Sequence, residues 1–349
     1  MKLQIKSKYN NNVIFEHDCE DNTIKKTILA AIEAKISLAN ANFENINLEF
    51  INFEDVDLKG VNFKNSNLLH VNFINSYLGA ANFANSNIKC SDFRGAELES
   101  AHFNYCNFEI VNFKCANLRY NDFTNTNIKN VNFVSSNLKD ASFDDANLKD
   151  PCFDSAILIK TSFKRTNIKY ATFRNAVLKY ANFEDANAKD ALFIKADCRA
   201  ANFDDASFKY VSFNFSDLER ANFKDTRFAN VSFGFAENVP YIPSNLPVGE
   251  FIAWKKCQDK IIKLKILKDS KRSRATSNKC RCDKALVLGF EEFNGTPITN
   301  ITEIVNTTYT ECHYKVGKIV YADKWDDNRW NECSNGIHFF IDRQSAIEY

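Results

Sequence analysis

The sequence predicts a mainly β protein whose central part turns a corner every five residues. Phe recurs at every tenth position from Phe43 to Phe233, without an insertion. A Leu or another large residue usually stands midway between successive Phe, as at Leu38 and Leu48. Gly and Pro number only 9 and 5 in 349 residues, so few ordinary tight turns are available. A short repeat sustained over this length predicts a solenoid.

The period of five fits neither standard element. On an α-helix the large residues would spiral around every face, and on a flat strand successive ones would point to opposite sides. A corner every five residues instead turns the large residue (position i) and the small residue two before it (i−2) inward. The two variable residues then form the corner and face water. Residues 36–236 would hold about ten coils of about 20 residues, stacked at about 4.8 Å.

The repeating unit resembles that of the pentapeptide-repeat family, A-(D/N)-L-x-x. The match runs through units such as Ala41-Asn42-Phe43 and covers some 200 residues. The resemblance implies a right-handed quadrilateral β-helix. Because Phe and Leu alternate every five residues, we expect two opposite faces to carry stacked Phe and the other two stacked Leu. Departures mark places to inspect: Asn121 and Pro151 replace the small apolar residue at i−2.

The regions flanking the repeat predict a cap and a further domain. We expect a hairpin over 3–16 and a helix over 23–35 with Asn22 as N-cap, covering the open first coil. After Ala236, three prolines indicate a linker. Apolar runs then predict strands at 260–267, 285–290 and 336–341, with Asp342 capping a short last helix. The expected domains are 1–35 (hairpin and capping helix), 36–236 (β-helix), 237–247 (linker) and 248–349 (C-terminal α+β domain).

Parts of the C-terminal region resemble a domain of unknown function that follows pentapeptide repeats in some phage, bacterial and giant-virus proteins. The resemblance rests on residues 251–257, 271–281 and 329–340. It implies an architecture and no established activity.

Composition excludes several classes. A 45% hydrophobic, near-neutral chain is not disordered, and a net charge of +1 gives no overall drive toward nucleic acid or anionic lipid. The N-terminus lacks the apolar run of a signal peptide, and no stretch approaches the ~18 apolar residues of a membrane span. The eleven Cys are scattered, which favours reduced thiols. We therefore expect a cytoplasmic protein, in the host cytoplasm or the virion if it is viral, and no membrane contact.

Residues 20 apart stack on one face, so surface chemistry can be read in columns. One column holds five lysines, Lys129, Lys149, Lys169, Lys189 and Lys209. It is a candidate binding stripe for a polyanion or an acidic partner, or else a solvated face whose counter-charge comes from neighbouring acidic columns. The opposite column reads Arg119, Lys139, Ile159, Lys179 and Arg199.

A second basic region lies in the C-terminal domain. Residues 255–284 sum to about +9, and five of their cations fall in a segment rich in Ser, Thr and Asn without obvious secondary structure. These are Lys271, Arg272, Arg274, Lys279 and Arg281. Such a segment can bind phosphate backbones or an acidic protein, or it can be a solvated loop.

Cysteine and histidine suggest two sharper hypotheses. The residues Cys280, Cys282, Cys312, His313 and Cys333 could together bind zinc, although zinc sites usually begin with C-x₂₋₄-C rather than C-x-C. Alternatively, Cys333 and His338 could act as nucleophile and base, although no orienting acid is evident.

These observations favour a non-catalytic interaction or scaffold protein, a rigid rod presenting a C-terminal recognition module. One alternative is that the C-terminal domain is catalytic or binds zinc. Another is a DNA-mimic regulator of a type II topoisomerase, a role known for some pentapeptide-repeat proteins. That role requires a strongly negative surface, and residues 36–236 sum to only about −2. We expect no cofactor, another protein as partner, nucleic acid as a possible ligand of residues 255–284, and a monomer or dimer.

Overall fold

The computed structural model describes residues 1–240, 249–274, 279–306, 312–326 and 335–349. The chain divides into two compact units. The first comprises Met1–Arg227 and Ala236–Pro240, and the second comprises Phe228–Phe235 and Tyr241–Tyr349.

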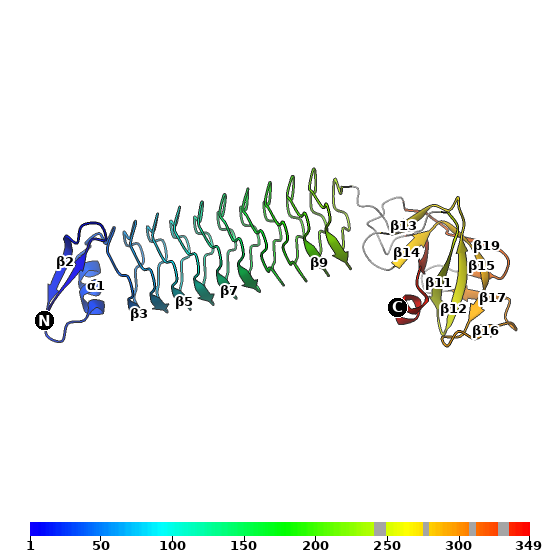
Figure 1. The fold of residues 1–349 in the computed structure, drawn as a ribbon, viewed down its shortest axis with the longest axis horizontal. Helices are drawn as coiled ribbons and strands as arrows, with labels where there is room; N and C mark the ends of the chain where they lie inside the picture. Colours follow the sequence, from blue (N-terminus) through cyan, green and yellow to red (C-terminus); the bar gives the residue numbers. More distant parts are fainter. Residues whose placement is uncertain (241–248, 275–278, 307–311, 327–334) are drawn as a thin grey trace. The chain divides into compact units, whose positions relative to one another are not determined.

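The chain begins with the predicted hairpin and helix. Strands β1 (Lys2–Lys6) and β2 (Val13–Asp18) pair antiparallel, and α1 (Ile24–Glu33) follows. Figure 1 shows α1 beside the first coil of the repeat, as expected for a cap.

The helix begins one residue later than the sequence indicated. Thr23, not Asn22, is the N-cap, and its side chain accepts a hydrogen bond from the backbone N–H of Lys26 at 3.1 Å. Asn22 instead donates to the carbonyl of His17 at 2.7 Å and accepts from the Thr27 hydroxyl. Both residue types suit an N-cap, and Asn22 is instead engaged in these two local hydrogen bonds.

The repeat forms a β-solenoid, as predicted. Residues 20 apart pair in parallel, as in the bridges Asn42↔Asn62 and Asn62↔Asn82 (Figure 1). On one face the pairing is regular enough to give a six-stranded parallel sheet. Its strands are β3 (Asn47–Glu49), β4 (Asn67–Leu69), β5 (Asn87–Lys89), β6 (Asn107–Glu109), β7 (Asn127–Lys129) and β8 (Asn147–Lys149). The strands β9 (Ser207–Lys209) and β10 (Arg227–Ala229) occupy the same column later in the chain.

Phe side chains fill the interior of the solenoid. Phe rings 20 residues apart stack face to face, and rings 10 apart meet edge to face. Phe123, for example, lies 4.6 Å from Phe143 with the rings 2° from parallel, and 5.9 Å from Phe133 at 86°. This confirms the predicted Phe faces and shows that they meet along the axis.

The corners are made by left-handed residues rather than by glycine. At Phe53–Val56, the Val56 N–H donates to the Phe53 carbonyl at 3.1 Å and Asp55 has φ 59°, as in a type II turn. The Asp55 N–H then donates to the carbonyl of Ile74 in the next coil at 3.1 Å. The same positive φ recurs every five residues, even at Ile110 and Tyr120. The sequence predicted the corners but not this conformation.

Pro151 lies where a corner needs no turn hydrogen bond. In this fully described part of the chain, the corners that follow β3–β8 have no bond between the large residue and the residue three later. After Pro151, the next two corners in the same column do have this turn hydrogen bond. The N–H groups of Ala171 and Ala191 donate to the carbonyls of Ile168 and Ala188. Because proline has no N–H to donate, it fits a corner that has no turn hydrogen bond.

The second unit is built on an antiparallel sheet with the order β13-β14-β20-β11-β12-β15-β16, and β19 pairs with β15. The strands are β11 (Phe251–Cys257), β12 (Lys260–Ile266), β13 (Arg272–Arg274), β14 (Lys279–Cys282), β15 (Lys284–Glu291), β16 (Pro297–Ile298), β19 (Ile319–Tyr321) and β20 (Ile337–Phe340). A separate hairpin joins β17 (Glu303–Asn306) and β18 (Cys312–Lys315). The final helix α2 (Arg343–Glu348) is N-capped by Asp342, as predicted.

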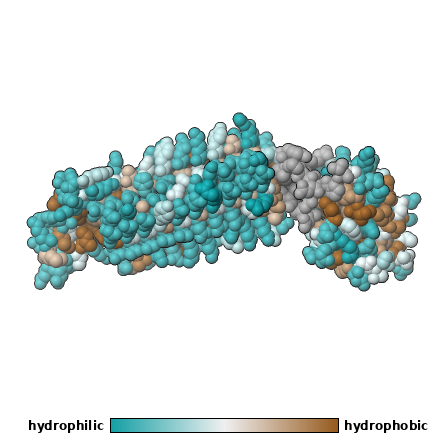
Figure 2. Space-filling model, in the orientation of Figure 1, coloured by the Kyte–Doolittle hydropathy of each residue, from teal (hydrophilic) through white to brown (hydrophobic). Residues whose placement is uncertain are grey.

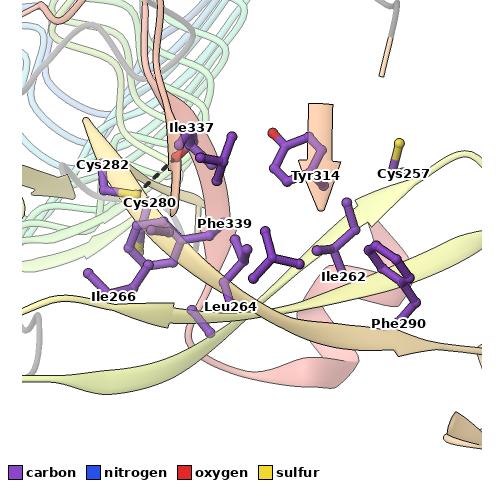
Figure 3. Close-up of a cluster of buried hydrophobic side chains, with 14 residues drawn as sticks. Cys257, Ile262, Leu264, Ile266, Cys280, Cys282, Phe290, Tyr314, Ile337 and Phe339 are labelled. Carbon is purple, nitrogen blue, oxygen red and sulfur yellow. Dashed lines mark hydrogen bonds between the residues drawn. The ribbon is translucent and has the colours of Figure 1, made fainter. Parts of the chain in front are cut away.

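Apolar side chains cover both faces of this sheet. One face carries the main core, which includes Leu264, Phe290 and Phe339 (Figure 3). On the other face Phe340 packs with Ala346 of α2. Within the described residues, no helix is long and apolar enough to cross a membrane.

Candidate functional site

The five predicted lysines form one column on the outer surface of the repeat. Lys129 on β7 is paired with Lys149 on β8. Lys169, Lys189 and Lys209 continue the register, because corner N–H groups in successive coils donate to their carbonyls. We call these residues the Lys column. On the face seen in the space-filling view, the surface of the repeat is mostly hydrophilic (Figure 2).

Neighbouring acids neutralise only part of the Lys column. Lys129 pairs with Glu109 at 2.7 Å, and Glu109 also reaches Lys89 at 3.3 Å. The hydrogen bond from Lys129 lowers the pKa of Glu109 below its ordinary value. Within the solenoid, which is fully described, Lys149 and Lys169 have no carboxylate within 4.0 Å. The predicted counter-charge therefore exists at Lys129 and at Lys189, which lies 3.7 Å from Asp190, but not at Lys149 or Lys169.

The opposite cationic column is better compensated. Lys179 lies 3.3 Å from Asp197, and Arg199 lies 2.8 Å from the same carboxylate. Lys139 is 4.0 Å from Asp140. The two columns look alike in sequence, and only the structure separates them.

An asparagine ladder runs beside the Lys column. The Nδ2 of Asn67 donates to the Oδ1 of Asn47, and this pattern continues through Asn87 and Asn107 to Asn127 at 2.7–3.1 Å. It resumes where Asn167 donates to Asn147 at 2.7 Å. In this fully described region no such bond joins Asn127 and Asn147. Asn recurs every 20 residues in the sequence, including at 127 and 147, so the sequence did not indicate that this bond would be missing.

A groove of about 470 Å³ lies over strands β5–β8. The Asn ladder and the Lys column contribute to its lining, and the strands form its floor. The lining residues are Asn87, Lys89, Asn107, Phe108, Glu109, Asn127, Ile128, Lys129, Asn147 and Lys149. The break in the ladder therefore falls inside this groove.

The basic C-terminal segment is more ordered than predicted. Strands β13 and β14 replace much of the expected loop. Arg272 donates to the carbonyl of Gly249 at 2.6 Å and lies over the Phe251 ring. Lys279 donates to the Tyr349 hydroxyl at 2.7 Å. Lys271 is exposed, and the side chain of Arg274 lies outside the described residues.

Arg281 is a core residue, so its prediction as a surface ligand was wrong. Its side chain is 1% exposed, and its guanidinium donates to the carbonyls of Asp326 and Asn335 at 3.0 and 2.8 Å. The indole of Trp325 lies 5.0 Å away. A guanidinium held in this way joins segments of the unit and is not available to a polyanion.

The cysteine and histidine candidates for zinc do not converge in the described residues. Cys280 and Cys282 lie in the core, where the thiol of Cys282 is 3.8 Å from the carbonyl of Ile337 (Figure 3). Burial raises the pKa of Cys282 well above its ordinary value, which disfavours the thiolate that a metal requires. Exposed His313 contacts Glu303 at 2.8 Å. No three metal-ligand side chains are grouped in the described ranges, and they include all candidates except Cys333.

Of the candidate nucleophile and base, only His338 belongs to the described residues. Cys333 lies outside the described residues, whereas His338 is half-buried on β20, paired with Arg281. Cys312, the remaining zinc candidate, is half-buried on β18.

A partly buried lysine was missed by the sequence argument. Lys255 shares the core-facing alternation of β11 with Ala253 and Cys257, and its ammonium lies 5.9 Å from the Tyr314 ring centroid. Burial lowers its pKa. The sequence could have indicated this, because residue 255 lies two positions from both Ala253 and Cys257 and so falls on the same face of a strand.

Two family models match the repeat. The pentapeptide repeat region matches residues 34–103 and 96–173, and the pentapeptide repeats (8 copies) match residues 156–193 and 189–225. Together they cover more than half of the chain. A family of unknown function (DUF5758) matches residues 243–346. Among curated proteins, no sequence matches the chain significantly.

Several solved structures are similar over the repeat. HetL, a pentapeptide repeat protein from Nostoc involved in heterocyst differentiation regulation, is 20% identical and covers 60% of this chain and 96% of its own, with a TM-score of 0.36. Full-length QnrB1, a plasmid-mediated fluoroquinolone resistance protein, is 14% identical over 57% and 92%, with a TM-score of 0.29. Rfr23 from Cyanothece is 20% identical over 36% and 100%, with a TM-score of 0.26. These values carry no functional inference.

Proposed function

Because the chain belongs to the pentapeptide-repeat family, we propose that it is a non-catalytic interaction scaffold. The observation that supports this is the filled interior of the solenoid. The Phe side chains at every tenth position from Phe43 to Phe233 are at most 9% exposed, so the solenoid can offer a partner only its outer columns. The C-terminal β unit would then act as a second recognition module.

Rigidity supports a scaffold role. Each coil is bonded to the next through backbone groups, as between Phe53 and Asn72 at 2.7 Å and between Phe63 and Asn82 at 2.7 Å. Side chains in one column are therefore held at a fixed spacing. A fixed array of this kind binds with little ordering cost.

Site-specific photo-crosslinking in the full chain tests the proposal. A benzophenone amino acid would replace exposed aromatic residues, Tyr105 or Tyr180 in the solenoid and Tyr321 in the C-terminal unit. Each variant would be irradiated in the cell that naturally makes the protein. We expect discrete higher-mass adducts from at least one position.

The same variants without irradiation control for adventitious complexes. Adducts at Tyr105 or Tyr180 would assign recognition to the solenoid, and adducts at Tyr321 to the C-terminal unit. If no position gave an irradiation-dependent adduct, the interaction-scaffold proposal would be wrong.

We do not propose a DNA-mimic role. Mimicry of DNA requires a continuous negative surface. The Lys column runs along one face of the solenoid instead, and Lys149 and Lys169 have no acidic partner among its residues.

A further inference from the structure

The break in the Asn ladder leaves hydrogen-bonding groups free inside the groove. Across the rest of the ladder, each bond uses a donor from one coil and an acceptor from the coil before it. Between Asn127 and Asn147, within the described solenoid, the donor of Asn147 and the acceptor of Asn127 have no ladder partner. Both side chains are exposed, so a ligand can reach them.

The two asparagines remain one coil apart. Their strands stay paired in parallel, with Asn127 opposite Asn147. The free amide N–H and the free carbonyl therefore face the same groove at about the 4.8 Å strand spacing. A ligand that fills the break needs an acceptor and a donor close together.

Lysines next to the break supply positive charge. Lys149 lies in the same strand as Asn147 and has no ion pair among the described residues of the solenoid. Glu109 shows how the column holds a carboxylate, because its two oxygens contact Lys89 and Lys129 in the coils on either side, at 3.3 and 2.7 Å. A carboxylate from a ligand can lie along the column in the same manner.

We propose that the groove over β5–β8 binds an extended acidic peptide segment of a partner protein. A peptide unit of the ligand bonds to Asn127 and Asn147, and its carboxylates pair with Lys149 and the lysines that follow. This inference rests on the proposed scaffold function and adds the chemistry of the partner and the place where it binds.

Hydrogen-bonding chemistry favours a peptide over a nucleic acid. A peptide bond carries both an N–H and a C=O, which match the free acceptor and donor at the break. A phosphodiester backbone offers acceptors only, so it would leave Asn127 without a donor. The column from Lys129 to Lys209 spans about 19 Å at the strand spacing, or about six residues of an extended peptide.

Fluorescence anisotropy with the full chain tests the proposal. The probe is a labelled ten-residue peptide of alternating Glu and Ser, measured at low salt because exposed ion pairs are screened. The double variant Lys129→Gln/Lys149→Gln should weaken binding about five-fold. Glu109→Gln should tighten binding, because it frees two ammonium groups. The matched control Lys139→Gln/Lys179→Gln, in the opposite column, should leave the affinity unchanged.

Asparagine variants separate a peptide from a generic polyanion. Asn147→Ala should weaken peptide binding about three-fold. Asn47→Ala is the matched control, since it removes only the ladder bond from Asn67, and both of these residues lie outside the groove. Circular dichroism of each variant confirms the fold. A labelled ten-nucleotide oligo-dT serves as the competing ligand and should be insensitive to Asn147→Ala.

Three outcomes would overturn the inference. They are no peptide binding, equal losses in the two lysine double variants, and oligo-dT binding that is tighter than peptide binding and equally sensitive to the groove variants. The last would identify a nucleic-acid surface. Crosslinked adducts in the cell would still support the scaffold function in each case, whereas their absence would remove it independently.

Discussion

Truncating one ring in the middle of the Phe stack tests the account of the core. Phe123 is fully buried and stacks on Phe103 and Phe143 at 5.0 and 4.6 Å. It also meets Phe113 and Phe133 edge-on at 6.2 and 5.9 Å. Phe123→Ala removes the ring from these four contacts and from a fifth, tilted contact with Phe108 at 6.1 Å. The neighbouring coils are hydrogen-bonded on both sides, so they cannot collapse into the space.

The expected loss is large. A buried Phe→Ala change costs about 3–5 kcal/mol of unfolding free energy, and sites that cannot relax lie at the upper end. Ring pairs add about 0.5–1.5 kcal/mol each beyond area burial. We therefore expect about 5 kcal/mol for Phe123→Ala. Phe123→Leu keeps most of the apolar volume and loses only the ring geometry, so about 1–2 kcal/mol is expected.

Urea unfolding of the full chain, followed by circular dichroism, measures the change. Native-state hydrogen exchange locates it, because a solenoid is destabilised most in the coils next to the substitution. Phe50→Ala is the matched control, since Phe50 lies at a corner and is 66% exposed. If Phe123→Ala cost no more than Phe50→Ala, the ring stack would not be the main stabilising element.

Three further substitutions test other features. Ile110→Asn should stabilise the solenoid by about 1 kcal/mol in urea unfolding, because asparagine tolerates the positive φ that a β-branched residue resists, whereas Ile110→Val should change nothing. Arg281→Ala should lower the stability of the C-terminal unit by about 3 kcal/mol through the space left by a buried side chain and the loss of its two hydrogen bonds to carbonyls, and Lys271→Ala by less than about 0.5 kcal/mol. Lys255→Met should raise stability at neutral pH by about 1 kcal/mol in thermal unfolding.

The pH dependence of Lys255 has a definite sign. Burial lowers the pKa of its amine in the folded state, so the unfolded chain binds more protons between the folded and unfolded pKa values. Stability due to this group therefore rises as pH increases through that window. Unfolding midpoints measured across alkaline pH should rise less steeply in Lys255→Met. An unchanged slope would contradict the burial of the amine.

Local sequence patterns predicted the solenoid because every five-residue unit places its large apolar residue at the same position. The spacing of Phe and Leu allowed only a corner every five residues, and alternation then set which side chains point inward. The left-handed conformation at Ile110 was not predictable, since no residue type there favours it. It arises because the corner N–H must reach a carbonyl of the next coil.

The two predicted basic surfaces differed in outcome, because one depends only on the repeat and the other depends on contacts with distant segments. The Lys column required only the 20-residue register, and the structure has it. The cations of the C-terminal segment looked alike in sequence, yet Arg281 is buried and Lys271 is exposed. Arg281 is buried because β14 is covered on both faces and because its guanidinium reaches the carbonyls of distant residues, which composition does not report.

The linear sequence alone determined the period, the apolar interior and the column in which each surface residue stands, because these follow from spacing within one repeating unit. Tertiary packing determined which polar groups find partners. It allowed the asparagine hydrogen bonds from Asn47 to Asn127 to form and left none between Asn127 and Asn147. It also left Lys149 without a counter-ion and buried Arg281. Such outcomes depend on distances between side chains in different coils and strands, and a change of about 1 Å is enough to make or lose a hydrogen bond.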